Sequence, residues 1–252
     1  MTTSASKSPQ SPPRNLLQME RRPHAILDRE SRVLKAQKIE ELVGRDRIEG
    51  ARVLDIGTGS GIMASELARH AAEVVGIDVR DQRQVKDGYR FVQVEGTTLP
   101  FEDRSFDVVL SNHVIEHVGH EPEQLHHLHE VRRVLADDGV VYLAVPNKWI
   151  VVEPHFRLPF LSWLPQRVAD RYVRSRGKGT FYDCDLPTRR RFVRLTEQAG
   201  LEAREITLDA MRVYDRLESP QGALARLLRA PEWALKPLMP AVPTLVYLLR
   251  KR

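Results

Sequence analysis

Two periods of hydrophobic and polar positions alternate along the 252 residues of this chain. Short apolar runs rich in Val, Ile and Leu are typical of buried strands, whereas apolar residues that recur every three or four positions are typical of helices. The apolar runs predict strands at 52–56, 73–78, 90–95, 106–111, 140–145, 201–208 and 244–249. The longer period predicts helices at 16–43, 62–70, 122–135, 188–199 and 220–229. Because strands alternate with helices, the pattern indicates an α/β fold with a parallel sheet that is covered on both faces.

The connection between the strand that ends at 145 and the helix that begins at 188 is unusually long. Ordinary connections take about 2–6 residues, so residues 148–187 are interpreted as an insertion with a helix of its own. Residues 1–15 are rich in Ser, Thr and Pro and lack the apolar stretch of a secretory signal, so we expect a flexible tail there. We therefore predict one domain over residues 16–252 that carries this insertion.

Composition excludes several classes of protein. Hydrophobic residues make up 42% of the chain and charged residues 29%, which excludes a largely disordered chain. No apolar run reaches the roughly 18 residues that span a bilayer. Cys184 is the single cysteine, so an intramolecular disulfide is excluded and a cysteine-based zinc site is not expected. A reducing, cytoplasmic location is favoured.

The net charge of +5 is concentrated in one part of the chain. Residues 149–200 hold ten Lys and Arg against five Asp and Glu, so the remaining charges sum to zero. A locally basic face is therefore favoured over a broadly basic surface, and we expect no nucleic-acid partner.

The most informative stretch is the glycine-rich turn that follows the first predicted strand. Gly57, Gly59 and Gly61 lie between this strand and a helix, and glycines let the backbone approach a ligand closely. The spacing Gly-x-Gly-x-Gly departs from the Gly-x-Gly-x-x-Gly of dinucleotide sites. Asp55 is a poor neighbour for a pyrophosphate but a good partner for an ammonium group, and Asp78 ends the next strand, where an acid holds ribose hydroxyls. These charges indicate a nucleoside that bears an amino acid.

Several blocks, in this order, resemble the Rossmann-like S-adenosylmethionine (SAM)-dependent methyltransferases. The resemblance covers roughly residues 30–210 and implies a Rossmann-like seven-stranded sheet, mostly parallel with an antiparallel last strand and with helices on both faces. The blocks that carry it lie at 53–61, 75–78, 95–101, 105–109, 112–118, 133–139, 145–147 and 188–200.

The resemblance also implies roles for matching positions. Asp55 would hold the SAM ammonium group, the glycine turn would shape the loop beneath the methionine part, and Asp78 would hold the ribose. Val79 would pack on the adenine, and Glu95 stands where the family usually has Asp near the adenine amino group. The implied cofactor-binding residues are Asp55, Gly57, Thr58, Gly59, Gly61, Asp78, Val79, Glu95, Gly96 and Asn112.

Histidines supply the candidate catalytic groups. His113, Glu116 and His117 form an H-x-x-E-H pattern on what is expected to be a short helix, so their side chains share one face. The pattern is similar to the acid-x-x-Glu-His arrangement of the quinone-biosynthesis O-methyltransferases, which can bind a divalent cation. We expect no metal, and these three residues are the candidate ligands if one is bound. His117, His113 and His155 are the candidate bases for an acceptor that holds a proton.

Three further histidines, His126, His127 and His129, lie on a polar helix and are expected to face solvent.

The insertion suggests what is methylated. Residues 156–164 are apolar and aromatic, and the following stretch places Leu164, Val168 and Tyr172 beside a face that carries Arg167 and Arg171. Such a segment is either a lid over the acceptor pocket or a peripheral membrane contact through 156–176.

We therefore predict a SAM-dependent methyltransferase that acts on a small or lipid-like acceptor, with oxygen as the preferred methylated atom. The alternatives are a protein or nucleic-acid methyltransferase and a catalytically silent SAM-binding protein.

Overall fold

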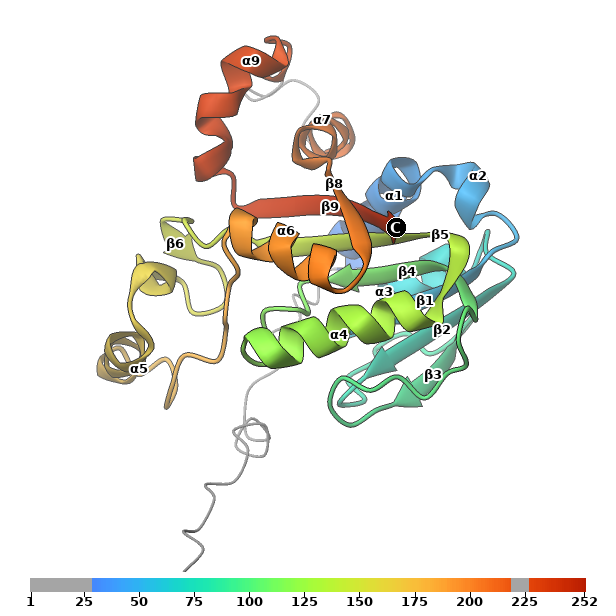
Figure 1. The fold of residues 1–252 in the computed structure, drawn as a ribbon, viewed down its shortest axis with the longest axis horizontal. Coiled ribbons are helices and arrows are strands. Elements are labelled where there is room, and N and C mark those ends of the chain that lie inside the picture. The colour runs from blue at the N-terminus through green and yellow to red at the C-terminus, as the bar shows by residue number, and fades with distance from the viewer. Residues whose placement is uncertain (1–28, 219–226) are drawn as a thin grey trace, which may run out of the picture.

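The computed structural model describes residues 29–218 and 227–252, and these residues form an α/β/α sandwich (Figure 1). Its strands are β1 (Arg52–Ile56), β2 (Glu73–Asp78), β3 (Arg90–Gln93), β4 (Phe106–Asn112), β5 (Leu135–Pro146), β8 (Leu201–Glu205) and β9 (Thr244–Lys251). They form one sheet in the order β3-β2-β1-β4-β5-β9-β8. Strands β1 to β5 pair in parallel, whereas β9 is antiparallel to both of its neighbours, β5 and β8. The predicted fold class and the antiparallel last strand are confirmed.

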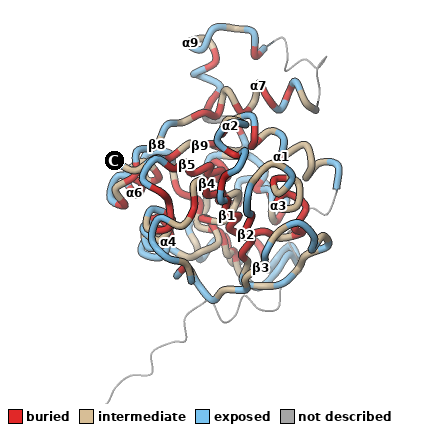
Figure 2. The backbone as a smooth tube through the Cα atoms, turned by 90° about the vertical axis from the view of Figure 1, so that its right-hand side faces the viewer, coloured by how far each residue is buried: buried red, intermediate tan, exposed pale blue. Residues whose placement is uncertain are grey.

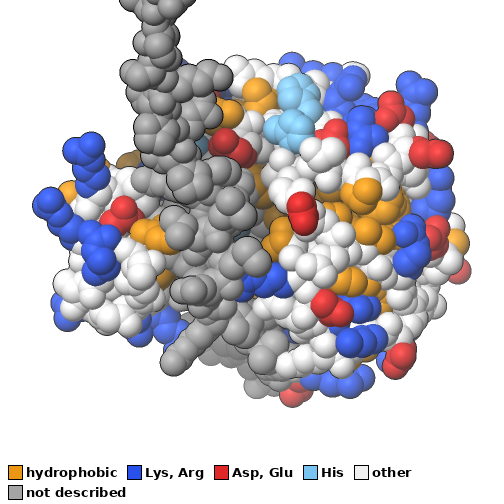
Figure 3. Space-filling view, turned by 90° about the horizontal axis from the view of Figure 1, so that it is seen from below, with side chains coloured by type: hydrophobic (Ala, Val, Ile, Leu, Met, Phe, Trp, Pro, Cys, Tyr) orange, Lys and Arg blue, Asp and Glu red, His pale blue; other side chains and the backbone are white. Residues whose placement is uncertain are grey.

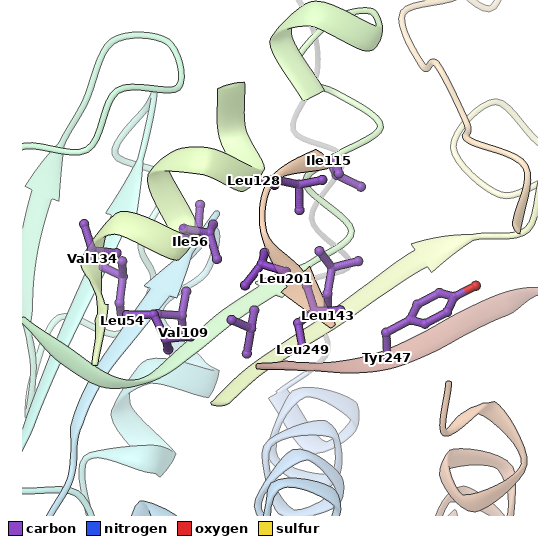
Figure 4. Close-up of a cluster of buried hydrophobic side chains, with 14 of the residues drawn as sticks. Leu54, Ile56, Val109, Ile115, Leu128, Val134, Leu143, Leu201, Tyr247 and Leu249 are labelled. Atoms are coloured by element: carbon purple, nitrogen blue, oxygen red, sulfur yellow. The ribbon is translucent and has the colours of Figure 1, made fainter. Parts of the chain in front are cut away.

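Each face of the sheet is covered by its own helices. Helices α4 (Glu121–Val134) and α6 (Arg189–Gln198) cover one face, and Figure 4 shows leucines and valines of the strands packed beneath α4. Helices α1 (Arg29–Val43), α2 (Arg45–Ile48), α3 (Ile62–Leu67) and α7 (Thr207–Glu218) cover the other face. The most buried backbone accordingly lies in the central strands (Figure 2).

The apolar runs of the strands explain why both faces need cover. Consecutive side chains of a strand point to opposite faces. In β1 the neighbours Val53 and Leu54 are both fully buried, and they belong to the two different apolar clusters. A strand without polar alternation therefore requires a helix on each side, which is the three-layer arrangement observed.

The insertion forms a small unit at the side of the sheet (Figure 1). It comprises the hairpin of β6 (Val152–Glu153) and β7 (Leu158–Pro159), the turn η2 (Leu161–Trp163) and helix α5 (Gln166–Ser175). Its buried apolar side chains form a third cluster that is separate from the two sheet clusters. The insertion follows β5, so it emerges at the edge of the sheet where the parallel strands end. No helix among the described residues has the length and apolarity needed to cross a membrane.

Several predicted boundaries differ from the structure. Strand β5 begins at Leu135 rather than at 140, because residues between Leu135 and Val140 form an irregular register against β4. The strand predicted for 201–208 ends at Glu205, and α7 begins at Thr207, whose hydroxyl bonds Glu205 and the backbone of β9. A short helix α9 (Glu232–Leu235) and the turn η3 (Lys236–Ala241) precede β9. The tail at 1–15, the start of the helix at 16–43 and most of the helix at 220–229 lie outside the described residues.

Candidate functional site

The glycine-rich turn after β1 has a backbone that other residues would strain. Gly57, Gly59 and Gly61 all have positive φ, at 74°, 56° and 79°. A Cβ on Gly57 would lie 2.6 Å from a methyl carbon of Val114, and one on Gly61 would overlap the hydroxyl of Tyr89. The turn therefore requires glycine for its conformation and for its close packing.

Asp55, near the end of β1, is a buried carboxylate. Its side chain is fully buried, and neither oxygen accepts a hydrogen bond within the described part of the chain. Burial, and then repulsion by Asp78, raise the pKa of Asp55 to about 7, while the charge of Arg32 opposes this shift. A cationic partner stabilises the ionised form of a buried carboxyl group whose pKa is raised in this way.

Asp78 closes the turn from the neighbouring strand. Its two carboxylate oxygens accept hydrogen bonds from the backbone N–H of Gly59 at 3.0 Å and of Arg80 at 3.2 Å. Each oxygen retains a further lone pair, which suits hydroxyl donors such as those of a ribose. The next residue, Val79, is 55% exposed and offers an apolar surface beside this carboxylate.

The hydroxyl of Thr58 faces the protein. It donates to the carbonyl oxygen of Asp55 at 3.0 Å, and the residue is buried. Gly76 on β2 leaves the space that this side chain fills, because a Cβ there would lie 2.5 Å from the Thr58 oxygen. Thr58 therefore shapes the turn through its side chain and has no hydroxyl directed to a ligand.

The remaining predicted cofactor positions lie after β3 and β4. Glu95 and Gly96 are exposed just beyond β3, and Gly96 has a φ of 69° with open space around its Cα. Asn112 is the partly buried last residue of β4. Because β1 to β4 are parallel, these positions share the edge of the sheet at which β1 and β2 end.

The segment 113–119 is a turn, so the predicted short helix is wrong. His113 has a φ of 59°, a left-handed conformation that ends β4 and prevents a helix from starting there. Its Nδ1 still lies 3.3 Å from Oε1 of Glu116, so the first two members of the H-x-x-E-H pattern do meet. Burial lowers the pKa of His113, which therefore favours the neutral imidazole.

Glu116 is a second fully buried acid on this turn, and neither of its oxygens accepts an aligned hydrogen bond within the described residues. Burial opposes its ionisation, but the neighbouring His113 and His117 outweigh burial and lower the pKa of Glu116. The backbone carbonyl of Glu116 accepts a hydrogen bond from the N–H of Asp185 at 2.8 Å. This bond fixes the end of the insertion beside the turn.

The other two candidate bases form a pair. The Nε2 atoms of His117 and His155 lie 3.3 Å apart, and the rings meet edge to face. On its other side, the Nδ1 of His155 lies 2.7 Å from the buried carboxylate of Glu153. Cys184 lies against both rings, with its sulfur 3.7 Å from His117 and 3.9 Å from His155. Neither Glu153 nor Cys184 was predicted for this site, because no local spacing relates the segments that carry them.

One expected surface histidine is in fact buried. His127 on α4 is 2% exposed, and its Nε2 lies 3.2 Å from the hydroxyl of Ser111. Burial lowers the pKa of His127 to about 4. The expectation that it faces solvent is wrong because α4 turns this position toward the end of β4, whereas His126 and His129 are exposed as expected.

The strand order, the glycine turn and the acid at the end of β2 define a Rossmann-like α/β domain with a nucleoside-type site. Residues 27–206 match the family model described as a methyltransferase domain, and the chain belongs to this family. The predicted family is thereby confirmed.

The relatives agree with this assignment. An uncharacterized methyltransferase of Mycobacterium sp. (strain JLS) is 36% identical over 135 residues, which are 51% of this chain and 52% of that protein. A ubiquinone biosynthesis O-methyltransferase of Dinoroseobacter shibae is 28% identical over 193 residues, or 70% of each chain. A SAM-dependent methyltransferase of Mesorhizobium loti has a similar fold, with a TM-score of 0.58, 14% identity, and coverage of 86% of this chain and 100% of that one. The match spans about half the length of the mycobacterial relative.

Proposed function

We propose that this chain binds S-adenosylmethionine where β1 and β2 end and transfers its methyl group to a hydroxyl oxygen of a lipid-like acceptor. The observation that carries the proposal is Asp55, a fully buried acid that has no hydrogen-bond partner among residues 29–218 and 227–252 and lies beside a glycine turn of positive φ. A ligand that bears an ammonium group would supply the missing partner. When bound, SAM supplies a methyl group on a positively charged sulfur, which is electrophilic without further activation.

The residues of the cradle would divide the cofactor among them. Asp55 would attract the ammonium group, directly or through water, and the glycine turn leaves room for the methionine part. Asp78 would accept hydrogen bonds from the ribose hydroxyls, and Val79 would cover one face of the adenine. Glu95 and Gly96 would lie near the adenine edge. The chief work of such a site is alignment and exclusion of water, which can contribute about 7–11 kcal/mol to catalysis.

His113 is the base that the geometry favours. It follows Asn112 directly at the end of β4, and Glu116 stands 3.3 Å behind its Nδ1. A neutral imidazole backed by a buried carboxylate can accept the proton that a hydroxyl acceptor loses on methylation. Oxygen as the methylated atom is also the chemistry in the names of the ubiquinone biosynthesis relatives.

The surface of the insertion supports a lipid-like acceptor. Its large exposed apolar side chains, which we call the insertion patch, are Trp149, Val151, Val152, Phe160, Trp163 and Val168, each between 44% and 52% exposed. Figure 3 shows Lys and Arg side chains on the same lobe, at the left of the view. Exposed aromatic residues beside basic ones suit contact with an anionic membrane surface.

A hollow on the outer surface of the insertion favours peripheral membrane contact over the interpretation of this segment as a lid on the acceptor pocket. It has a volume of about 510 Å³ and is lined entirely by insertion residues, among them Phe160, Leu164, Val168 and Tyr172. The face of α5 that carries Val168 and Tyr172 therefore opens outward, whereas Ala169 and Val173 pack inside the insertion. We propose peripheral membrane contact through residues 156–176, with the acceptor reaching the site from the lipid surface.

Two measurements test the proposed function. Purified protein is incubated with methyl-labelled SAM and an extract of the source cells, and the label is partitioned among organic solvent, aqueous small molecules and precipitated macromolecules. Label in the organic phase supports the proposal, label in the aqueous phase overturns its lipid part, and label in the precipitate indicates a protein or nucleic-acid methyltransferase. The affinity for SAM is measured by calorimetry, and Asp78→Asn serves as a variant in which binding should be weaker. If the wild-type protein binds SAM but transfers no label, it is a silent SAM-binding protein.

A further inference from the structure

Three side chains with metal-binding atoms meet where the insertion joins the core of the protein. His117 comes from the turn after β4, His155 from the hairpin of the insertion, and Cys184 from the segment that returns to α6. One donor atom of each residue lies within 4.8 Å of the other two. Two imidazoles and one thiolate are a donor set that zinc prefers.

The spacing of the histidine nitrogens suits two ligands of one ion. Zinc binds nitrogen at about 2.0–2.1 Å, so two nitrogens of a tetrahedral site lie about 3.3 Å apart. The Nε2 atoms of His117 and His155 lie 3.3 Å apart. The sulfur of Cys184 lies 3.7 Å from Nδ1 of His117 and 3.9 Å from Nδ1 of His155, which places the thiol against both rings. One donor atom of each residue lies within 4.8 Å of the other two, so a small side-chain adjustment brings the sulfur onto an ion held by the histidines.

A buried carboxylate already orients one of these ligands. The Nδ1 of His155 lies 2.7 Å from Oε1 of Glu153, whose other oxygen accepts a bond from the backbone N–H of Phe156. A histidine that donates Nδ1–H to a carboxylate presents Nε2 as its metal-binding atom, which is the usual arrangement of a zinc-bound histidine. The Nε2 of His155 is the atom that faces His117.

The surroundings carry negative charge that a cation would compensate. Glu116 and Glu153 are both fully buried beside the cluster, where Glu116 lies against His113 and Glu153 against His155. Neither oxygen of Glu116 accepts an aligned hydrogen bond in this part of the chain. Two fully buried carboxylates beside the cluster favour a divalent cation over an empty site.

We propose that His117, His155 and Cys184 bind a zinc ion, which joins the insertion to the turn after β4 and keeps a fourth position open. Binding releases the thiol proton of Cys184 to solvent, and the thiolate becomes the third ligand. The proposed site shares only His117 with the H-x-x-E-H pattern, and it reverses the sequence-based expectations of no metal and no cysteine-based zinc site. It does not depend on which acceptor is methylated.

Cobalt substitution is the decisive experiment. The full chain is stripped of metal with a chelator, dialysed and titrated with Co²⁺, while its near-ultraviolet and visible absorption is recorded. Because Cys184 is the only cysteine of the chain, a thiolate-to-cobalt charge-transfer band identifies this residue as a ligand without any variant. We expect that band, together with the strong visible bands of tetrahedral cobalt, to saturate at one ion per chain and to be displaced by zinc.

Variants then test the histidines. Cys184→Ser should abolish the charge-transfer band, His155→Ala should weaken cobalt binding at least tenfold, and His129→Ala, on the exposed side of α4, should leave both unchanged. Zinc should raise the melting temperature of the wild-type chain and of His129→Ala but not of Cys184→Ser. Absence of the charge-transfer band in the wild-type chain would overturn the proposal, and so would unchanged cobalt affinity in His155→Ala.

Discussion

Replacing Asp55 by Asn is expected to stabilise the ligand-free protein and to weaken its affinity for SAM. The side chain is fully buried and has no hydrogen-bond partner in the part of the chain that the structure describes, and burial together with Asp78 raises its pKa from 3.8 to about 7. Between these two values the unfolded chain has released the Asp55 proton while the folded protein retains it. Stability from this residue is therefore fully present below about pH 4 and is lost as the pH rises to about 7.

The difference between the two pKa values sets the size of the effect. A shift of about three units, at about 1.4 kcal/mol for each unit, costs the folded wild-type protein about 4 kcal/mol at pH 8 and about 2 kcal/mol at pH 5. Asn carries no charge at either pH. The wild-type protein should therefore lose about 2–3 kcal/mol of unfolding free energy relative to Asp55→Asn between pH 5 and pH 8.

Urea denaturation of both proteins at pH 5 and pH 8 measures this difference. The quantity to compare is the change in the stability difference between pH 5 and pH 8, because the amide of Asn adds the same cost of burial at both pH values. Asp87→Asn, at an exposed position, serves as the control and should follow the wild-type profile. Parallel pH profiles for wild-type and Asp55→Asn would refute the reasoning. The same variant should bind SAM about tenfold to a hundredfold more weakly by calorimetry, because the ammonium group loses a charged partner.

Three other predictions follow from burial and backbone geometry. The folded protein holds His127 neutral down to a pKa of about 4, so the wild-type protein loses about 2 kcal/mol of unfolding free energy at this residue between pH 7 and pH 5. His127→Gln should lack that loss in urea denaturation, and parallel pH profiles of the two proteins would contradict this. Gly61→Ala should lower the free energy of unfolding by more than about 3 kcal/mol, measured by thermal or urea unfolding. Gly96→Ala is strained only by its φ of 69° and should lower it by about 1 kcal/mol. Equal losses would rule out the steric argument. Trp163→Ser should lower the amount of protein that sediments with vesicles of phosphatidylcholine and phosphatidylglycerol about tenfold. The side chain of Trp233 is 75% exposed but lies outside the insertion patch, so Trp233→Ser should leave sedimentation unchanged. An equal loss in both variants would mean nonspecific adsorption.

The framework of the fold was predictable because its information is local. Apolar runs mark strands that are buried on both faces, and β1, β2 and β4 lie within a residue of their predicted bounds. Where polar residues belong to a strand, the same criterion fails. Asp137, Asp138 and Gly139 occupy the irregular start of β5, which the apolar pattern placed at 140. His113 shows a different failure, since side-chain spacing predicted a helix but a left-handed backbone ended it.

The two halves of the site differ in how they are assembled. The cofactor cradle is built from one turn and the end of the next strand, and parallel pairing of Asp55 with Gly76 brings Asp78 to the glycine turn. A short motif can specify such an arrangement. His155 and Cys184 instead reach His117 from 38 and 67 residues away, through the separate apolar cluster of the insertion. Since periodicity carries no information about such contacts, the insertion can change what meets His117 without disturbing the residues that hold the cofactor.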